Sequence, residues 1–399
     1  MHKTLFLTGA GFAYSWDGLL TKEVTKELIS ENEIFRMLFR HYESKGYVLN
    51  FEELLNIIEL LFQKYYGEKF GKTNHDFVPI ANVFDVQKDI AHFFELDLKL
   101  NEENTHLAIS NLYFELIKGV VEIIRKYALS VKDGKHKELN TNLNMFISNA
   151  NGNNPLRYYT TNYDRLVIDA CPDIHFFDGF SVDEITDMDE IKKFRLQETS
   201  KILTDRHTNC HYNLHGSIYW DVVRKYSTPN IVCSKNTVVS DFSHYQNFTT
   251  LLDSNPKEFQ LVSPIITGLQ KIQRTNISPF NAMSASFLTD CFECDMWYIL
   301  GYSFSDPHIN NMLRTAMADK NTRPKKIVWV SYDEKNKTKI EQPISILPFR
   351  QTFTPQIDLE SQDFVCIEEY SFYSEKDGLG LYFGGFSSFL EKEIWKQYK

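Results

Sequence analysis

Five short runs of apolar and β-branched residues recur along the chain, and each one ends in a loop of small or polar residues. The runs are residues 4–7, 156–160, 210–214, 296–300 and 327–331. Continuous apolar runs of this length are typical of parallel strands that are covered on both faces. A helix-like pattern precedes the fifth run, and strands that alternate with helices form βαβ units. We therefore predict an α/β fold with a Rossmann-like, mostly parallel sheet and helices on both faces.

The segment between the first and second runs has a different, helical pattern. Apolar residues recur there at the spacing of amphipathic helices. The predicted helices are residues 51–65, 86–96 and 104–128. We therefore expect a helical insertion over residues 30–145, beside a Rossmann-like domain made of residues 1–29 and 146–399.

Three later segments are predicted from their composition. Residues 180–208 are charged and polar, which favours an excursion on the surface. Residues 224–256 are rich in Ser, Thr and Asn, which favours a loop. The tail carries glycines and aromatic residues and is expected to end in a short helix over residues 386–396.

Composition narrows the class of protein. The chain has 399 residues, of which 43% are hydrophobic and 24% charged, as in ordinary globular proteins. The formal net charge of −10 argues against direct binding of nucleic acid, which needs a concentrated basic face. Six irregularly spaced cysteines fit a reducing compartment better than a disulfide framework. With neither a signal peptide nor an apolar run near the ~20 residues of a membrane helix, we expect a soluble, cytoplasmic protein that does not contact membranes.

The loops that follow the predicted strands suggest chemistry, because ligands of open α/β sheets bind at the carboxyl ends of the strands. The first loop is Gly9-Ala10-Gly11-Phe12. Glycines at this place let the backbone approach a pyrophosphate, and the N-terminus of the following helix offers N–H groups to the anion. The same residues also fit a tight strand-to-helix turn that binds no ligand.

The second loop is Thr160-Thr161-Asn162-Tyr163-Asp164. The carboxamide of Asn162 can donate to and accept from ribose hydroxyls or a water molecule, although it also fits an ordinary Asx turn. Asp164 could orient a neighbouring group or cap a helix over residues 165–170, because Asp is a favoured N-cap.

The third loop contains His215, followed by Gly216. The ordinary pKa of a histidine, ~6.5, suits acid–base chemistry near neutral pH. The chain has 12 histidines, and most histidines are structural or exposed. The place of His215 at a strand end is what makes it a candidate.

The fourth loop combines small residues with a helix start. Gly301, Ser303 and Ser305 are candidates for contact with phosphates. Asp306 stands before Pro307, and this pair is typical of the N-terminus of a helix. Helix capping is therefore the simpler interpretation of Asp306.

Taken in order along the chain, the four loops resemble those of the Sir2 (sirtuin-like) family. The matching residues are Gly9-Ala10-Gly11, Thr160-Thr161-Asn162-Tyr163-Asp164, His215-Gly216 and Gly301-Tyr302-Ser303. The Gly-Tyr-Ser-Phe-Ser-Asp sequence resembles bacterial Sir2-like proteins of antiphage defence, of the kind paired with a HerA-type ATPase, more than protein deacetylases. The resemblance covers about residues 1–20 and 155–335 in short blocks, and it implies an NAD-binding Rossmann-like fold.

The chain departs from sirtuin deacylases in two places. Those enzymes hold a structural zinc with two Cys-x-x-Cys pairs, whereas only Cys291 and Cys294 have ligand spacing in the corresponding interval, which also contains Cys233. Tetrahedral zinc needs four ligands, so buried thiols and no metal are expected. Residues 261–265 lack the strand sequence that pairs with an acyl-lysine peptide, and Pro264 removes a ladder donor.

The resemblance implies that NAD+ is the substrate and that Asn162 and His215 are the catalytic residues. Asn162 would position the ribose hydroxyls and the attacking water, and His215 would act as a base. The residues expected to bind NAD+ are Gly9, Ala10, Gly11, Phe12, Asp164, Gly301, Ser303 and Ser305. Cleavage of the nicotinamide–ribose bond needs no strong acid, because this nicotinamide is already cationic and the transition state resembles an oxocarbenium ion.

Without an acyl-lysine acceptor, water is the default nucleophile, which predicts an NAD+ glycohydrolase that releases ADP-ribose and nicotinamide. In the defence branch such an enzyme depletes NAD+ during abortive infection and is controlled by a second protein. We expect a homo-oligomer with a HerA-type ATPase as its partner, or alternatively a short Argonaute. The alternative functions are an NAD-dependent protein deacylase and a non-catalytic sensor of NAD or ADP-ribose.

Overall fold

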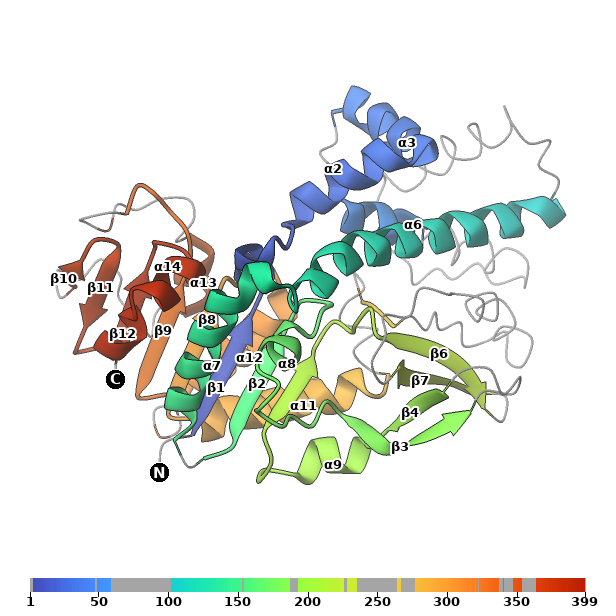
Figure 1. The fold of residues 1–399 in the computed structure, drawn as a ribbon. Helices are drawn as coiled ribbons and strands as arrows, with labels where there is room; N and C mark the ends of the chain where they lie inside the picture. The colour runs from blue at the N-terminus through green and yellow to red at the C-terminus, as the bar shows by residue number, and fades with distance from the viewer. Residues whose placement is uncertain are drawn as a thin grey trace.

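A computed structural model gives the architecture of the chain (Figure 1). The structure describes residues 3–46, 49–58, 102–152, 154–186, 193–225, 228–234, 264–266, 277–319, 321, 323–336, 340, 347–353 and 364–398. Among the helices in these ranges, none is long and apolar enough to cross a membrane.

The main sheet has eight strands in the order β10-β11-β12-β9-β8-β1-β2-β5. Their bounds are β1 (Thr4–Thr8), β2 (Leu156–Thr160), β5 (Cys210–Asn213), β8 (Met296–Leu300), β9 (Lys326–Val330), β10 (Val365–Glu368), β11 (Ser371–Ser374) and β12 (Leu379–Tyr382). The five strands predicted from apolar runs are confirmed, and β9 is displaced by one residue from its predicted range. All five residues of β1 are buried, as expected of a strand covered on both faces.

The parallel part of this sheet has the order of a doubly wound fold. Strands β5, β2, β1, β8, β9 and β12 are all parallel, and only β10 and β11 add antiparallel pairings at one edge. In chain order, β2 and β5 lie on one side of β1, and β8 then lies on its other side. The strand order therefore reverses between β1 and β8, which is where ligands bind in such folds.

Helices cover both faces of the sheet, as predicted (Figure 1). Helix α7 (Lys137–Asn151) covers one face together with α14 (Phe386–Glu391). Phe146 of α7 contacts Phe6 and Tyr298 of the sheet edge-on, with ring centroids 5.7 and 5.0 Å apart. Helices α11 (Phe280–Glu293), α12 (Pro307–Ala318) and α13 (Leu347–Phe353) lie on the other face, where Phe287 packs against Tyr159.

The predicted helical insertion is present in part among the described residues. It contains α3 (Glu33–Ser44), a helical stretch over residues 51–58 and the long α6 (Glu102–Ser130), whereas α2 (Thr21–Glu31) lies almost entirely before its predicted start at residue 30. The remainder of the predicted helix 51–65, and the helix predicted over 86–96, lie outside the described residues. The domain division stays a prediction, and its boundary between residues 145 and 146 falls inside α7.

A second, four-stranded antiparallel sheet was not predicted. Its order is β3-β4-β7-β6, with the bounds β3 (Phe180–Thr186), β4 (Lys193–Gln197), β6 (Trp220–Lys225) and β7 (Thr228–Ser234). The short helix α9 (Thr199–Thr204) follows β4 in the chain and precedes β5 of the main sheet. The prediction of a loop from residue 224 is therefore wrong where β6 and β7 lie. The prediction of a surface excursion over 180–208 is not contradicted, because residues 182–184 of β3 are exposed, although the strands within it were not predicted. In β3, β4 and β6 charged residues interrupt the apolar ones, and in β7 Pro229 and Asn230 precede the apolar residues, so these strands give no long continuous apolar run.

The remaining elements are short. They are α1 (Ala10–Ala13), η1 (Tyr14–Trp16), η2 (Gly134–His136), α8 (Leu166–Ala170) and η4 (Ile394–Tyr398). The tail helix predicted over 386–396 is divided into α14 and η4. The break coincides with Glu393, whose φ of +52° no helix can contain.

Candidate functional site

The four loops singled out in the sequence lie together at the carboxyl edge of the main sheet. They follow β1, β2, β5 and β8, which are neighbours in the sheet. The strands end level, because Thr8 pairs with both Thr160 and Leu300. Backbone bonds from Thr161 N–H to Thr8 O (3.0 Å) and from Leu214 N–H to Thr160 O (2.9 Å) join successive loops.

The loops after β1 and β8 are in direct backbone contact through their glycines. Gly9 N–H donates to Leu300 O at 3.1 Å, and Gly11 N–H donates to Gly301 O at 3.0 Å. Gly301 has a φ of +60°, and a Cβ at this position would lie 2.1 Å from Phe12 N. Only glycine fits there, both for its left-handed backbone and for the close approach of the two loops.

The backbone N–H groups of the first loop are already engaged within the protein. Besides the two bonds above, Phe12 N–H donates to Gly9 O at 2.9 Å. Binding of a pyrophosphate by the loop from Gly9 through Ala10 and Gly11 to Phe12 therefore stays a prediction. For three of these amides it requires that bonds within the protein be exchanged for bonds to the anion.

Asn162 is buried and joins two of the loops. Its Nδ2 donates to Gly9 O at 3.1 Å, and its backbone N–H donates to Thr160 Oγ1 at 3.0 Å. Asn213 Nδ2 holds the loop from below by donating to the carbonyls of Asn162 (2.9 Å) and Asp164 (2.6 Å). Among the described residues nothing donates to Asn162 Oδ1, so this oxygen can accept from a ribose hydroxyl or a water molecule.

Asp164 is a buried structural residue as well as a candidate. Its carboxylate accepts from Leu166 N–H, at the first residue of α8, at 2.9 Å and from Tyr127 Oη of α6 at 2.7 Å. Burial raises the pKa of the Asp164 carboxyl, and these two hydrogen bonds offset part of the rise. The N-cap of α8 is Arg165 and not Asp164, so the predicted capping position is wrong by one residue. Contact between Asp164 and NAD+ stays a prediction.

The loop after β8 alternates between buried and exposed side chains. Tyr302, Phe304 and Asp306 are buried, whereas Ser303 and Ser305 are exposed with their hydroxyl oxygens 2.8 Å apart. One of these two serine hydroxyls donates its hydrogen to the other. The other remains able to donate to an anion such as a phosphate oxygen.

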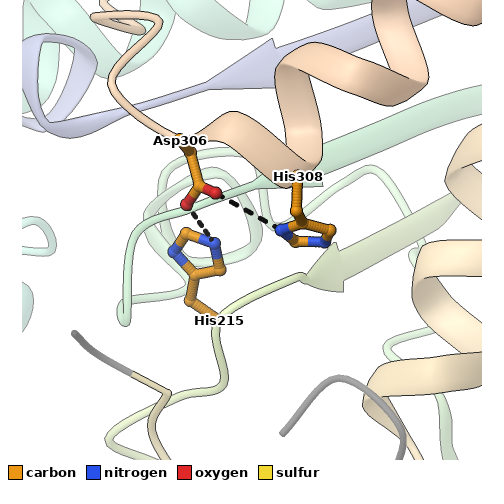
Figure 2. A group of neighbouring side chains, drawn as sticks. All are labelled: His215, Asp306 and His308. Atoms are coloured by element: carbon orange, nitrogen blue, oxygen red, sulfur yellow. Dashed lines mark hydrogen bonds and ion pairs between the residues drawn. The ribbon is translucent and has the colours of Figure 1, made fainter. Parts of the chain in front are cut away.

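The inward-facing residue Asp306 lies between two histidines (Figure 2). Its Oδ2 is 2.8 Å from Nε2 of His215, and its Oδ1 is 3.3 Å from Nδ1 of His308. His215 and Asp306 are each 3% exposed. The His215–Asp306 contact is an ion pair only when the imidazole is protonated. Its direction is poorly aligned for a hydrogen bond, as is common at catalytic pairs before a substrate binds.

Asp306 stands at the N-cap of α12, as predicted, but its side chain makes no capping hydrogen bond. An N-cap aspartate normally accepts from the first turn of its helix. The carboxylate here is directed instead toward His215, which comes from the loop after β5. Pro307 occupies the first position of α12 and has no N–H to cap.

Sequence reasoning missed the role of Asp306 and did not consider His308. The local sequence gives one weak signal, a carboxylate and an imidazole two residues apart in Asp306-Pro307-His308. Pro307 at the first helical position is compatible with capping by Asp306, so it does not favour one role over the other. His308 Nε2 is buried and has no hydrogen-bond partner in the described part of the chain. One nitrogen of each histidine and one oxygen of Asp306 all lie within 4.8 Å of one another, so the three side chains could also hold a metal ion.

The cysteines behave as the sequence suggested. Cys291 and Cys294 are buried and free, and burial raises the pKa of both thiols well above the ordinary value. Zinc binds the thiolate, which this environment disfavours. Cys233 lies in the second sheet, on β7, beside Arg195.

The geometry of His215 suits proton transfer. A carboxylate 2.8 Å from Nε2 favours the tautomer with its proton on that nitrogen. The other ring nitrogen, Nδ1, then carries the lone pair and can accept a proton from a hydroxyl or a water molecule. This is the arrangement of a base oriented by a buried acid.

Comparison with known proteins agrees with these findings. No curated protein matches the chain. The family model of the SIR2-like domain matches residues 156–348, which include Asn162, His215 and Asp306 but not the loop after β1. The match supports the Sir2-like family, whose members use NAD+ as substrate, and so indicates an NAD-related activity for this chain in general terms.

Proposed function

We propose that this protein is an NAD+ glycohydrolase, which hydrolyses NAD+ to ADP-ribose and nicotinamide. The observation that carries the proposal is the buried pair of His215 and Asp306 at the carboxyl edge of the sheet. Asn162 lies on the loop that follows the neighbouring strand. The match to the SIR2-like domain supports NAD+ as the substrate.

Each residue has a distinct part in the proposed reaction. Asn162 Oδ1 accepts from a ribose hydroxyl or from the attacking water and so fixes the reacting carbon. His215 Nδ1 takes the proton of the water as its oxygen bonds to C1′ of the ribose. The C1′–N bond breaks, and its electron pair neutralises the nicotinamide ring. Asp306 is a positioning residue that orients His215 and stabilises its charged form.

The residues present fit NAD+ best at its reactive end. The buried Nε2 of His308, which lacks a partner among the described residues, and the accepting oxygen of Asn162 provide polar groups for the ribose. The exposed hydroxyls of Ser303 and Ser305 offer a donor for the pyrophosphate. The predicted contribution of the Gly9–Phe12 amides depends on the exchange of their present bonds.

Water is favoured over a peptide as the acceptor because of the segment beside His215. Ser217 N–H donates to Pro264 O at 3.1 Å, and Ile266 N–H donates to His215 O at 2.7 Å. These backbone groups are therefore occupied by the loop of His215 and are unavailable to pair with an acyl-lysine peptide. Hydrolysis requires no such pairing.

We further propose that the activity depletes NAD+ in bacterial antiphage defence, as the resemblance implies. Unrestrained hydrolysis of NAD+ would kill the cell, so the activity requires control. We expect a homo-oligomer that pairs with a HerA-type ATPase, because a chain with a net charge of −10 leaves nucleic-acid sensing to a partner. Copurification with a candidate ATPase, and NAD+ hydrolysis with and without it, test this part.

The activity itself is tested by product analysis of the purified chain, alone and with a candidate ATPase. Nicotinamide and ADP-ribose are quantified for the wild type and for Asn162→Ala and His215→Ala. The matched control is His207→Ala, an exposed histidine just before β5, at the opposite end of that strand from His215. Both site variants are expected to lose release by about 10²-fold or more, and the control to retain it.

Other outcomes contradict the proposal in distinguishable ways. Nicotinamide release that depends on an added acyl-lysine peptide, with acylated ADP-ribose as product, would make the protein a deacylase. Binding of NAD+ without release under every condition would make it a sensor. Equal release by all variants would place the chemistry elsewhere.

A further inference from the structure

We propose that His215, Asp306 and His308 form a binding site for Zn²⁺ that switches the catalytic centre off. The inhibitory consequence rests on the function proposed above, whereas the binding of the metal does not. The three side chains come from the loop after β5 and from the start of α12 (Figure 2). Neither the resemblance to sirtuins nor the cysteines would place a metal here.

The donor set selects the kind of metal. Two imidazoles and one carboxylate suit Zn²⁺ and related transition metals, and a zinc site with three protein ligands keeps its fourth position open. Mg²⁺ and Ca²⁺ prefer oxygen ligands and are disfavoured by the two imidazoles. The carboxylate also provides a charge that compensates part of the charge of the cation.

The distances are close to those of an assembled zinc site. Ligand atoms at 2.0–2.2 Å from a tetrahedral zinc lie about 3.3 Å from one another. Here Asp306 is 2.8 Å from His215 Nε2 and 3.3 Å from His308 Nδ1, and all three ligand atoms lie within 4.8 Å. The widest pair therefore needs to close by at most ~1.5 Å, which rotation of the imidazole side chains can supply.

A second observation points to a ligand that completes the cluster. The carboxylate of Asp306 stands at an N-cap without making a capping bond, which is explained if it is arranged around a ligand rather than around the helix. His308 presents Nδ1 to the same carboxylate. Its other nitrogen, Nε2, is buried without a hydrogen-bond partner in the described ranges, and zinc on Nδ1 leaves that nitrogen for a polar group of the substrate.

The metal would inhibit hydrolysis because it would bind His215 Nε2 and the Asp306 carboxylate, the two groups that set the tautomer of His215. With zinc on Nε2 and on Asp306, the other nitrogen of the ring, Nδ1, carries the proton of the neutral imidazole. That nitrogen can then no longer accept a proton from water. Zinc should therefore abolish turnover without displacing the loops that hold the rest of NAD+.

The test combines metal binding with activity, on the full chain. Zn²⁺ binding is measured by titration calorimetry, and Co²⁺ is used as a coloured probe of tetrahedral coordination. The variants are His308→Gln, which removes one ligand, and His207→Gln as the matched histidine control. Cys366→Ser removes the exposed thiol as an alternative zinc ligand. Thermal melts establish that each variant is folded.

We expect one Zn²⁺ per chain for the wild type and both controls, and affinity at least about tenfold weaker for His308→Gln. NAD+ hydrolysis, normalised to each variant's own activity without metal, should fall with Zn²⁺ in the wild type and much less in His308→Gln. Mg²⁺ should have no such effect.

Two results would overturn the proposal. Zinc binding of equal strength in the wild type and His308→Gln would place the metal elsewhere, even if no hydrolysis is ever observed. Zinc bound at this cluster while hydrolysis continues unchanged would remove the inhibitory role and leave the proposed function standing.

Discussion

Two buried carboxylates on neighbouring helices of the same layer are held in opposite ways. Asp290 of α11 packs under the middle of β2 and is 1% exposed, whereas Asp306 stands at the carboxyl edge of the sheet and is 3% exposed. Burial is therefore nearly the same. The partners of the two carboxylates are what differ.

Asp290 is surrounded by groups whose charge or proton does not change near neutral pH. Arg157 Nε lies 2.6 Å from its Oδ2, Tyr159 Oη donates to the same oxygen, and Arg206 Nε lies 3.7 Å from Oδ1. Arg157 also donates to Ser286 Oγ at 3.3 Å. An arginine is always protonated, so this network has a single state and serves the fold.

Asp306 is paired instead with two histidines, the side chains that gain and lose protons near neutral pH. One histidine nitrogen of this cluster has no partner within the described residues. Asp290 Oδ1 is also buried without a hydrogen bond in the described part of the chain, so an unfilled position does not separate the two networks. What separates them is that Asp290 faces the permanent charge of arginines, whereas Asp306 faces imidazoles. Permanent charges thus lie under the middle of the sheet, while the imidazoles lie at its carboxyl edge, which is where ligands of doubly wound sheets bind.

The largest expected effect is on stability at the arginine-paired site. Asp290→Asn leaves Arg157 buried without a countercharge and should lower the free energy of unfolding by about 3–5 kcal/mol. Chemical denaturation measures this loss. The control is Asp295→Asn, at a partly exposed pair in which the Lys325 side chain lies largely in solvent, where a loss of about 0–1 kcal/mol is expected. Equal losses in both variants would contradict the structural role of the buried pair.

The next effect is on catalysis at the histidine-paired site. Asp306→Asn removes the charge that orients His215 and should lower kcat by about 10²–10⁴-fold, with a smaller change in KM. Its unfolding free energy should fall less than that of Asp290→Asn. Asp319→Asn, at the far end of α12, controls for loss of a carboxylate and should keep its kcat. A loss of stability without a loss of kcat would make Asp306 a purely structural residue.

The smallest effect concerns a buried histidine that has no adjacent carboxylate. His211 of β5 stacks on Tyr158 with ring centroids 4.9 Å apart, and burial lowers its pKa to about 4. The folded protein keeps His211 neutral, whereas the unfolded chain protonates it below its ordinary pKa of ~6.5. Wild-type stability should therefore fall as the pH drops from about 6.5 toward 4.

His211→Phe removes this pH-dependent loss and retains the aromatic stack. Between pH 7 and pH 5, the unfolding free energy of the wild type should fall by about 2 kcal/mol more than that of the variant. Urea denaturation of both proteins across pH 7 to 5 measures the difference. Parallel pH profiles would show that burial does not depress the basicity of His211.

The sheet and its loops were predictable because their signals are local. Runs such as residues 156–160 and 296–300 consist mostly of aliphatic and aromatic residues, with Arg157 as an exception, and their bounds agree with β2 and β8. The glycines of the first and fourth loops were recognised, although the structure explains them first by the contact between Gly301 and Phe12. The second sheet was not predicted because charged and polar residues interrupt the apolar residues of its strands. Pairing between distant segments, such as β4 and β7, stabilises these strands.

The candidate site was only half predictable for a related reason. His215 and Asn162 were identified by their positions after strands. The direction of the Asp306 side chain depends on a contact with a residue 91 positions earlier in the chain, and the local sequence favours capping equally well. His308 has no signal of its own except its distance from Asp306.

The most direct test of the central claim is the rate of product formation from NAD+ by the wild type and His215→Ala, per folded chain and with the candidate partner present. We predict equal amounts of nicotinamide and ADP-ribose from the wild type and a rate lower by about 10²-fold or more in the variant. The same rate in both proteins would contradict the assignment of the catalytic centre to the histidine–aspartate cluster.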